Sequence, residues 1–397
     1  MADYANTDSA TTGVAAGRAQ PQTTVEPAGG PFVRHTQEGR RSMYVATPGF
    51  GGVVSNPMVA SPGYNRGYRI KTTATTAGGT TGVIAATAGG QDAPYSLYQL
   101  VQVKDAFGTP ILTGPGYEIL KLVPEFSGQF GTDETQDVAN LPSWTGITAA
   151  SGAFKFSSYL PFEFAKAYGV ISGANASLLP TLQFNLATAS TLFSTAPTVL
   201  PTLTTQVDSD FYWLPEGVAV EPPGIGTTCQ YIYQPCNPVI PSNGSLIVQL
   251  PRLGGYLTCI ILELRDANGA RVDAWPARPR IYVDGVPLID SDLDTIIDDM
   301  AIQSMVGGGS AGSQTTASTP QTPRPPGVIC ITRKTGLAQR HFGLFDTGEE
   351  FLSTNPGTQI EISGMPWGAI GSGPATLNAI VGQVVPSGAL IQGLPEV

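Results

Sequence analysis

Hydrophobic and polar residues alternate over several short stretches of this chain, which is the pattern of β-strands with one buried face. The clearest stretch is 154–164, where one face carries Phe154, Phe156, Ser158, Leu160, Phe162 and Phe164. Lys155, Ser157 and Glu163 lie on the opposite face. A face this apolar predicts that the strand packs against a second sheet. The alternation recurs in Leu182, Phe184 and Leu186.

Turn signals divide the rest of the chain into further short strands. Residues 97–104 end at a turn, 105–108, and we predict a hairpin between this strand and a strand at 117–123. A second tight turn, Asp266-Ala267-Asn268-Gly269, follows a strand in the second half of the chain. The strands expected in that half are 246–250, 256–265, 280–283 and 328–331.

Helical periodicity is rare. An amphipathic helix is predicted at 292–305, because Leu293, Ile296, Ile297, Met300 and Ala301 fall at helical spacing. Asp294, Asp298 and Asp299 lie on its other side. A shorter helix is predicted at 165–179, between two strands.

The order of elements repeats along the chain. A strand, a helix and a strand occur at 154–187 and again at 280–332, which indicates duplication of one β-sandwich module. A length of 397 residues also predicts two domains. We expect a flexible N-terminal arm at 1–42, a first module at 43–205 and a second at 206–397, with an exposed flexible loop at 306–326.

Composition supports an all-β chain. The sequence has 48 Gly and 34 Pro, which helix interiors do not tolerate, so short strands and many turns are expected. Only 13% of the residues are charged while 41% are hydrophobic. Much of the surface is therefore neutral, which suits packing against neighbouring molecules. An ordinary secreted β-protein is the alternative reading of this composition.

The charge is acidic and unevenly distributed. The net charge of −10 argues against direct nucleic-acid binding, which needs clustered Lys and Arg. Residues 1–71 carry seven basic and four acidic groups, so the N-terminal part is mildly basic.

Cysteine usage and the termini give a cellular context. The four cysteines, Cys229, Cys236, Cys259 and Cys330, form no CxxC pair, so buried free thiols are expected. A bridge between Cys229 and Cys236 across a turn remains open. Residues 1–22 lack the apolar core of a signal peptide and no run reaches 18 apolar residues, so we expect synthesis in a cytoplasm.

The sequence contains few signs of a catalytic or metal-binding site. The acidic run Asp290, Asp292, Asp294, Asp298 and Asp299 resembles the opening of a calcium loop, but Thr295 and Ala301 stand where that loop needs Gly and Glu. The histidines are His35 and His341, and no GxSxG occurs. We therefore expect no catalytic, cofactor-binding or metal-binding residues and no enzyme.

Three segments resemble the double jelly-roll major capsid proteins of tectivirus-like viruses. They are Ala153–Phe164, Gly173–Pro180 and Leu182–Leu186, where an aromatic strand ending in Leu-Pro-Phe leads to the next strand. Shorter matches are Tyr256–Arg265 with its turn and Gly327–Cys330. The resemblance covers the chain mainly as an order of elements.

The resemblance implies two tandem eight-stranded jelly-roll β-sandwiches with short helices in their loops. It further implies pseudo-hexagonal homotrimers that tile an icosahedral shell over an internal membrane in the virion of a bacteriophage. The partners would be neighbouring trimers, penton proteins and minor capsid proteins, and the N-terminal arm would contact the membrane. Synthesis would take place in the host cytoplasm.

The sequence is also compatible with two other functions. A carbohydrate-binding or fibre-like adhesion module would also be all-β, with the exposed aromatics Tyr212, Trp213 or Trp367 as sugar platforms. A hydrolase on a jelly-roll scaffold would depend on His341.

Overall fold

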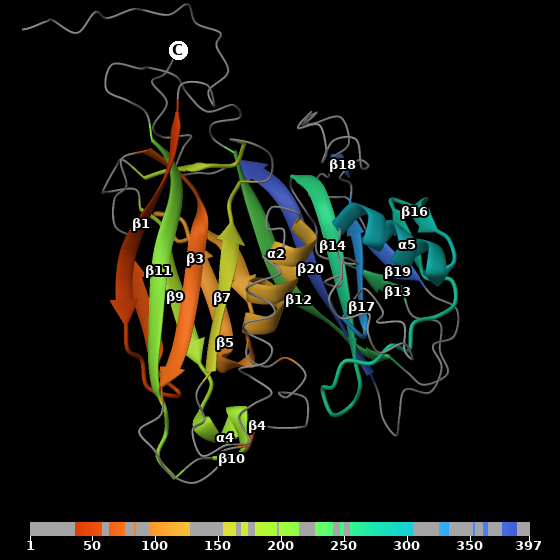
Figure 1. Ribbon diagram of the computed structural model, residues 1–397. Coiled ribbons are helices and arrows are strands. Elements are labelled where there is room, and N and C mark those ends of the chain that lie inside the picture. The colour runs from red at the N-terminus through yellow and green to blue at the C-terminus, as the bar shows by residue number, and fades with distance from the viewer. Residues whose placement is uncertain are drawn as a thin grey trace, which may run out of the picture.

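A computed structural model gives the fold (Figure 1). It describes sixteen stretches of the chain: residues 36–57, 63–75, 83–84, 92, 95–127, 154–163, 168–173, 179–196, 198–213, 227–240, 247–249, 255–304, 325–332, 352–353, 360–363 and 375–386.

Eight strands form a first β-sandwich. In chain order they are β1 (Gln37–Ala46), β2 (Val53–Pro57), β3 (Gly63–Thr75), β5 (Tyr98–Lys104), β6 (Pro110–Gly114), β7 (Phe154–Pro161), β9 (Thr181–Leu186) and β11 (Thr202–Trp213). One sheet has the order β1-β11-β3-β7, and the other has the order β2-β9-β5-β6. Short additions are β4 (Val83–Ile84), β8 (Ile171–Ser172), α4 (Ala189–Leu192) and β10 (Phe193–Thr195).

Eight more strands form a second β-sandwich. They are β12 (Thr227–Ile240), β13 (Ile247–Gln249), β14 (Tyr256–Arg265), β15 (Arg280–Val283), β16 (Val286–Asp290), β17 (Val328–Thr332), β19 (Ile360–Ser363) and β20 (Ala375–Pro386). The two sheets have the orders β12-β20-β14-β17 and β13-β19-β15-β16. A short strand, β18 (Leu352–Ser353), pairs with β14.

The strand order is the same in both halves. Counted within each half, the first, eighth, third and sixth strands share one sheet, and the second, seventh, fourth and fifth share the other. Eight antiparallel strands in two such sheets make a jelly roll. The expected fold, two tandem eight-stranded jelly rolls, is therefore confirmed.

One sheet runs through both jelly rolls. The fifth strand of the first roll, β6, pairs in parallel with the first strand of the second roll, β12, at Leu112–Tyr231 and Thr113–Ile232. The pairing joins four strands of each roll into a single sheet. The rolls therefore share backbone hydrogen bonds as well as side-chain contacts.

Alternation in the sequence correctly predicts several strands. Leu182, Phe184 and Leu186 are buried on β9 while the residues between them are partly exposed. On β7, Phe156 and Leu160 are buried against the opposite sheet. The strands predicted at 97–104, 256–265, 280–283 and 328–331 are also present as β5, β14, β15 and β17.

The predicted hairpin has a different second strand. Its turn at 105–108 is confirmed, with Gly108 at φ +86° and the Asp105 carboxylate accepting from the amides of Phe107 and Thr109. The partner of β5 is β6, and the strand predicted at 117–123 is wrong, because that segment is helical. It forms η3 (Glu118–Leu122) followed by α2 (Val123–Ser127).

The helices revise the internal repeat. The amphipathic helix predicted at 292–305 is present as α5 (Leu293–Ser304), with Ile296 and Met300 buried. It lies between the fifth and sixth strands of the second roll, and η3–α2 occupies the same place in the first. The helix predicted at 165–179 is therefore not the counterpart of α5. Of that segment, Ile171–Ser172 is the strand β8, and residues 165–167 and 174–178 lie outside the described residues.

Two expected boundaries fall inside strands. β1 begins at Gln37, so the last residues of the expected arm, 37–42, pair with β11. The division between 205 and 206 lies within β11, which pairs with β1 and β3 of the first roll throughout its length. The second roll begins with β12 at Thr227. The loop predicted at 306–326 lies outside the described residues, apart from Pro325 and Pro326.

Candidate functional site

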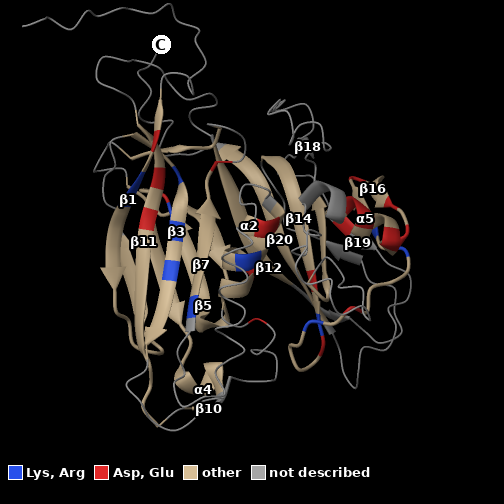
Figure 2. Ribbon diagram, viewed as in Figure 1, with Lys and Arg blue, Asp and Glu red and all other residues tan. Residues whose placement is uncertain are grey.

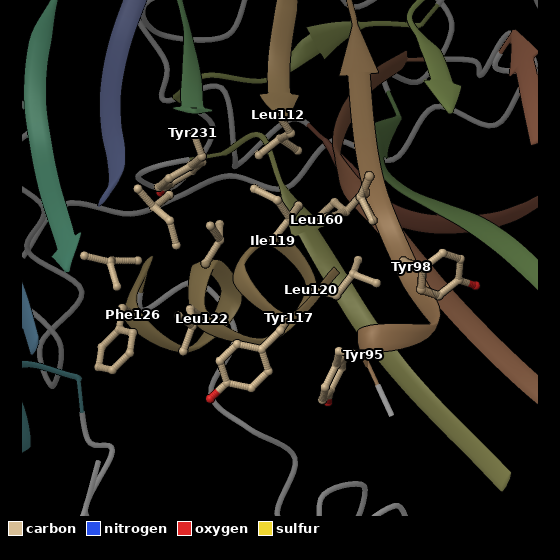
Figure 3. Packing of buried hydrophobic residues seen from close by; sticks show 14 of the residues in the cluster. Tyr95, Tyr98, Leu112, Tyr117, Ile119, Leu120, Leu122, Phe126, Leu160 and Tyr231 are labelled. Carbon is tan, nitrogen blue, oxygen red and sulfur yellow. The ribbon is translucent and has the colours of Figure 1, made fainter. Parts of the chain in front are cut away.

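In the described part of the chain, the junction between the two rolls combines apolar packing with buried ion pairs. Figure 3 shows side chains of η3 and α2 within the core, with Ile119 directed toward Leu112. Ile119, Leu122 and Phe126 from these helices are fully buried. They belong to the same core as Leu112 of β6 and Tyr231 of β12. This apolar packing surrounds the strand pair that joins the rolls.

An arginine of the second roll lies beside three carboxylates at this junction. Arg265, the last residue of β14, forms ion pairs with Asp92 (Nη1–Oδ2 2.7 Å) and Glu118 (Nη2–Oε1 3.1 Å) of the first roll. It also pairs with Glu263 of its own strand at 2.7 Å and donates from Nη1 to the Gly269 carbonyl at 2.9 Å. One guanidinium thus binds groups from both rolls.

A second arginine extends the cluster. Arg271 donates from Nε to Asp92 Oδ1 at 2.8 Å, so Asp92 bridges two arginines of the second roll. Its guanidinium carbon lies 4.3 Å from the centre of the Tyr117 ring, a favourable cation–π position. On the other side of the cluster, Asn378 of β20 donates to Glu263 Oε2 at 3.2 Å. We call these residues the junction cluster: Asp92, Tyr117, Glu118, Glu263, Arg265, Arg271 and Asn378.

Burial and neighbouring charges shift the pKa values of two groups in the junction cluster. Two arginines face three carboxyl groups, and a buried net charge is costly. Burial raises the pKa of Glu118 well above its ordinary value, and the neighbouring Glu263 and Asp92 raise it further against the opposing effect of Arg265. Burial alone would lower the pKa of Arg265, but Glu263, Asp92 and Glu118 raise it overall.

The outer face of the sheet β1-β11-β3-β7 carries a separate set of charged and aromatic side chains. Figure 2 shows acidic positions on β11 beside basic positions on β3. The Asp210 carboxylate accepts from Arg40 of β1 at 2.6 Å and from Arg69 of β3 at 2.8 Å. Arg69 also lies 5.4 Å from the centre of the Tyr159 ring on β7. These contacts span all four strands of the sheet.

A second group on this face ties the same strands together. Arg66 pairs with Glu163 at 2.6 Å and with Glu38 at 3.0 Å, and its guanidinium lies 4.6 Å from the Tyr212 ring. The Tyr212 hydroxyl donates to Glu163 at 2.7 Å. Burial and Glu163 both raise the pKa of Tyr212 far above its ordinary value, so the phenol stays protonated.

These arrangements hold strands together. The carboxylates of Asp210, Glu163 and Glu38 are paired with arginines. Among the described residues no group of three or more His, Cys, Asp or Glu is placed to hold a metal ion. No described helix has the length and apolar character needed to span a bilayer.

The acidic residues of the run that resembles a calcium loop have different surroundings in the structure. Asp290 forms ion pairs with Arg278 at 2.8 Å and with Arg280 at 3.0 Å, which hold the end of β16 close to the start of β15. Asp294, Asp298 and Asp299 lie on the exposed face of α5, as expected from helical spacing. His35 and His341 lie outside the described residues.

The aromatic residues named as sugar platforms divide into two kinds. Tyr212 is wrong for that role, because its side chain is fully buried against Arg66 and Glu163. Trp213 is 42% exposed at the end of β11. Trp367 lies outside the described residues.

The cysteines behave as buried thiols. Cys229, Cys259 and Cys330 are free and buried, which confirms the expectation for these three. A bridge between Cys229 and Cys236 is wrong, since Cys229 is free and both residues lie on β12. Seven residues along one strand separate the two by roughly 23 Å, far beyond the reach of a disulfide.

Sequence reasoning missed the junction cluster. The usable signal was the presence of Glu263 and Arg265 at the end of an otherwise apolar strand, where charges need partners when buried. Glu118 gave a similar signal within an apolar segment. The partners of Arg265 in the first roll, Asp92 and Glu118, lie 173 and 147 residues away, so the sequence did not identify these pairs.

Comparisons with known proteins agree with the fold. No protein-family model matches the chain, and no curated protein matches it in sequence. A crystal structure of the STIV MCP aligns with a TM-score of 0.58 and 12% identity, covering 91% of this chain and 100% of that chain. The atomic structure of Sulfolobus Turreted Icosahedral Virus also aligns with a TM-score of 0.58 and 12% identity, covering 90% of this chain and 94% of that chain.

A third alignment concerns an enzyme. A structure of peptide: N-glycanase F aligns with a TM-score of 0.29 and 9% identity, covering 87% of this chain and 95% of that chain. A score this low gives no basis for comparing the two proteins.

The strand order and the first two alignments show that the chain has the fold of the double jelly-roll viral major capsid proteins.

Proposed function

We propose that this protein is a viral major capsid protein, and that it acts as a structural subunit rather than an enzyme. The observation that carries the proposal is the pair of complete jelly rolls with one strand order, joined side by side through β6 and β12. Fold alone does not define function. The pairing of Asp210, Glu163 and Asp92 with arginines adds support for an architectural role.

The proposed assembly is a homotrimer. Three copies bring six jelly rolls together, and six similar units arranged in a ring give a nearly hexagonal outline. Such outlines tile a closed icosahedral shell, with penton and minor capsid proteins completing it. The low charge of the chain, 13% of residues, favours close lateral packing of neighbouring trimers.

The proposal places the protein in the virion of a tectivirus-like bacteriophage after synthesis in the host cytoplasm. The shell would enclose a membrane, and the mildly basic N-terminal residues, which carry Arg18 and Arg34, would meet its anionic headgroups. Direct contact with nucleic acid is not part of the proposal, because the chain carries a net charge of −10.

The mass of the purified protein in solution tests the proposed function. Light scattering after size-exclusion chromatography should give three times the chain mass of 41.3 kDa, and electron microscopy of assembled particles should show hexagonal units. A stable monomer at micromolar concentration would refute the trimer.

Truncation tests the role of the N-terminal residues separately. Deleting residues 1–35 leaves all of β1 in place to pair with β11, so the trimer should remain while vesicle binding is lost. A matched deletion of residues 1–46 removes all of β1 and should destabilise the first roll. Unchanged binding of the shorter deletion to vesicles with anionic lipids would remove the membrane contact from the proposal.

A further inference from the structure

A tight turn of the second roll connects the two arginines of the junction cluster. Residues 266–270 lie between Arg265 and Arg271, which face each other in a backbone bridge. Both guanidinium groups bind Asp92 of the first roll. Arg265 also donates to the Gly269 carbonyl at 2.9 Å, so the turn itself is bonded to the junction cluster. A change in the main chain of the turn would therefore displace side chains that hold the rolls together.

The turn contains a dipeptide that is prone to deamidation. Asn268 is exposed and precedes Gly269, which has no side chain to hinder attack by its own amide nitrogen. After losing its proton to a base in solvent, this nitrogen bonds to Asn268 Cγ, and the side-chain nitrogen leaves as ammonia. Water then opens the succinimide ring. Opening at the former side-chain carbonyl gives aspartate, and opening at the former main-chain carbonyl gives isoaspartate, whose main chain is longer by one carbon.

Hydrogen bonds within the turn oppose this reaction. The Gly269 amide donates to the Asp266 carbonyl at 2.9 Å, so the proton that must leave is held in a hydrogen bond. The Asp266 carboxylate accepts from the amides of Asn268 and Ala270, each at 2.8 Å. Its negative charge therefore lies beside the nitrogen that must become negative, and like charges repel. Reaction requires the turn to open first, and it should proceed in proportion to the open population.

We propose that Asn268 is a deamidation site that Asp266 protects in the folded chain, and that reaction there weakens the junction between the rolls. Isoaspartate at this position lengthens the main chain between Arg265 and Arg271, so the turn cannot keep both its own hydrogen bonds and the contact of Arg265 with the Gly269 carbonyl. In the proposed capsid the junction would weaken as the particle ages. The protection belongs to the folded chain and does not depend on the proposed trimer, so its failure would leave the proposed function standing.

A turn of the first roll has the same hydrogen bonds without the asparagine. The Asp105 carboxylate accepts from the amides two and four residues further along the chain, and the Gly108 amide donates to the Asp105 carbonyl at 3.1 Å. Gly108 has a φ of +86°, and its counterpart in the second roll has +78°. Phe107 stands where the other turn has Asn268, and it is 50% exposed. The variant F107N therefore places Asn-Gly in the same geometry outside the junction cluster.

Peptide mapping by mass spectrometry tests the protection in the full-length chain at mildly alkaline pH. In urea, Asn268 should react as fast as the asparagine of the second Asn-Gly pair, Asn243-Gly244, and in native protein it should react more slowly. D266A should react about tenfold faster than the native parent or more, because one hydrogen bond to a charged acceptor changes a local equilibrium by about that factor. D266N keeps the acceptor oxygen without its charge, so its rate should lie between the two.

The F107N variant keeps the test independent of how well D266A folds. Its new asparagine should react as slowly in the native chain as Asn268 does. Equal rates at position 268 in native and unfolded protein, or rapid reaction of the new asparagine in native F107N, would overturn the protection. A folded D266A that reacts no faster than the parent would overturn the role of Asp266.

Urea unfolding tests the link to the junction. The deamidated fraction of the parent, separated by ion exchange, should unfold at a lower urea concentration than N268D, which carries the same charge on an ordinary main chain. In R265M the contact with the Gly269 carbonyl is already gone, so the difference between these two forms should be smaller there. An equal difference in both backgrounds, or none in the parent, would overturn the link between deamidation and the junction.

Discussion

Replacing Arg265 by methionine should destabilise the protein far more than removing an exposed arginine. The Arg265 guanidinium binds three carboxyl groups and a carbonyl at distances between 2.7 and 3.1 Å, and its side chain is only 12% exposed. Methionine preserves much of the apolar stem but none of the donors. Breaking a buried ion pair from one side costs about 3–5 kcal/mol, because the remaining charges lose their partner.

Arg278 provides the matched control. It pairs with Asp290 at 2.8 Å, but its side chain is 47% exposed. Exposed ion pairs contribute about 0–1 kcal/mol, so R278M should be nearly neutral. Urea unfolding followed by tryptophan fluorescence would measure both variants, and R265M should lower the midpoint by more than about 1 M. Equal midpoints for R265M and R278M would refute the assigned role of the junction cluster.

The raised pKa of Glu118 should make the stability of the protein depend on pH. Its pKa is raised in the folded state above the ordinary value of 4.5. As the pH rises, the unfolded chain therefore releases the Glu118 proton before the folded protein does. The stability that this group contributes is full below pH 4.5 and is lost as the pH rises through the raised pKa. E118Q has an uncharged side chain at every pH. It should therefore change the free energy of unfolding little at neutral pH, and stability should fall less steeply as the pH rises. A large loss of stability in E118Q at neutral pH would mean that Glu118 is ionised there.

Two further predictions concern the core. Phe126 of α2 is fully buried, so F126A should cost about 3–5 kcal/mol by urea unfolding. The control F107A changes a side chain that is 50% exposed and should stay within about 0.5 kcal/mol; similar losses in the two variants would contradict the packing of α2. Cys229, Cys259 and Cys330 should react with a thiol reagent only after unfolding, and rapid labelling of these three in the native protein would contradict their burial.

The strands could be predicted where one face is buried and the other is not. β9 shows this best, since its buried and partly exposed residues alternate without exception. The second half of the fold followed from β14 and α5, whose apolar residues matched their periods. The eightfold strand count came from the family resemblance, because strands as short as β13 leave too little periodicity to detect.

The segment 117–123 shows why periodicity failed in one place. Tyr117, Ile119 and Val123 are separated by even numbers of residues, so they fit a strand as well as a helix. In the structure both Glu118 and Ile119 are buried, a pattern that alternation excludes. Glu118 is buried because Arg265 of the other roll reaches it, and a contact across 147 residues leaves no local trace.

The division between the rolls was misplaced for a related reason. In a jelly roll the last strand returns to pair with the first, so β11 belongs with β1 although more than 150 residues separate them. Local turn signals cannot show that return. The sequence placed the division near residue 205 because the pattern of the second half resumes there, whereas pairing keeps the strand in the first roll.

The junction has a consequence for assembly that the separate rolls would lack. Were the two rolls joined only by the segment between β11 and β12, their relative angle would vary and the proposed ring of three chains would close poorly. The shared sheet fixes one direction of approach, and the junction cluster fixes a second by holding η3 of the first roll against β14 of the second. In some proteins buried polar contacts specify one arrangement of the packed parts. We expect the polar residues at the junction to set the angle between the rolls, so R265M should impair closure of the proposed ring even under conditions where the chain remains folded.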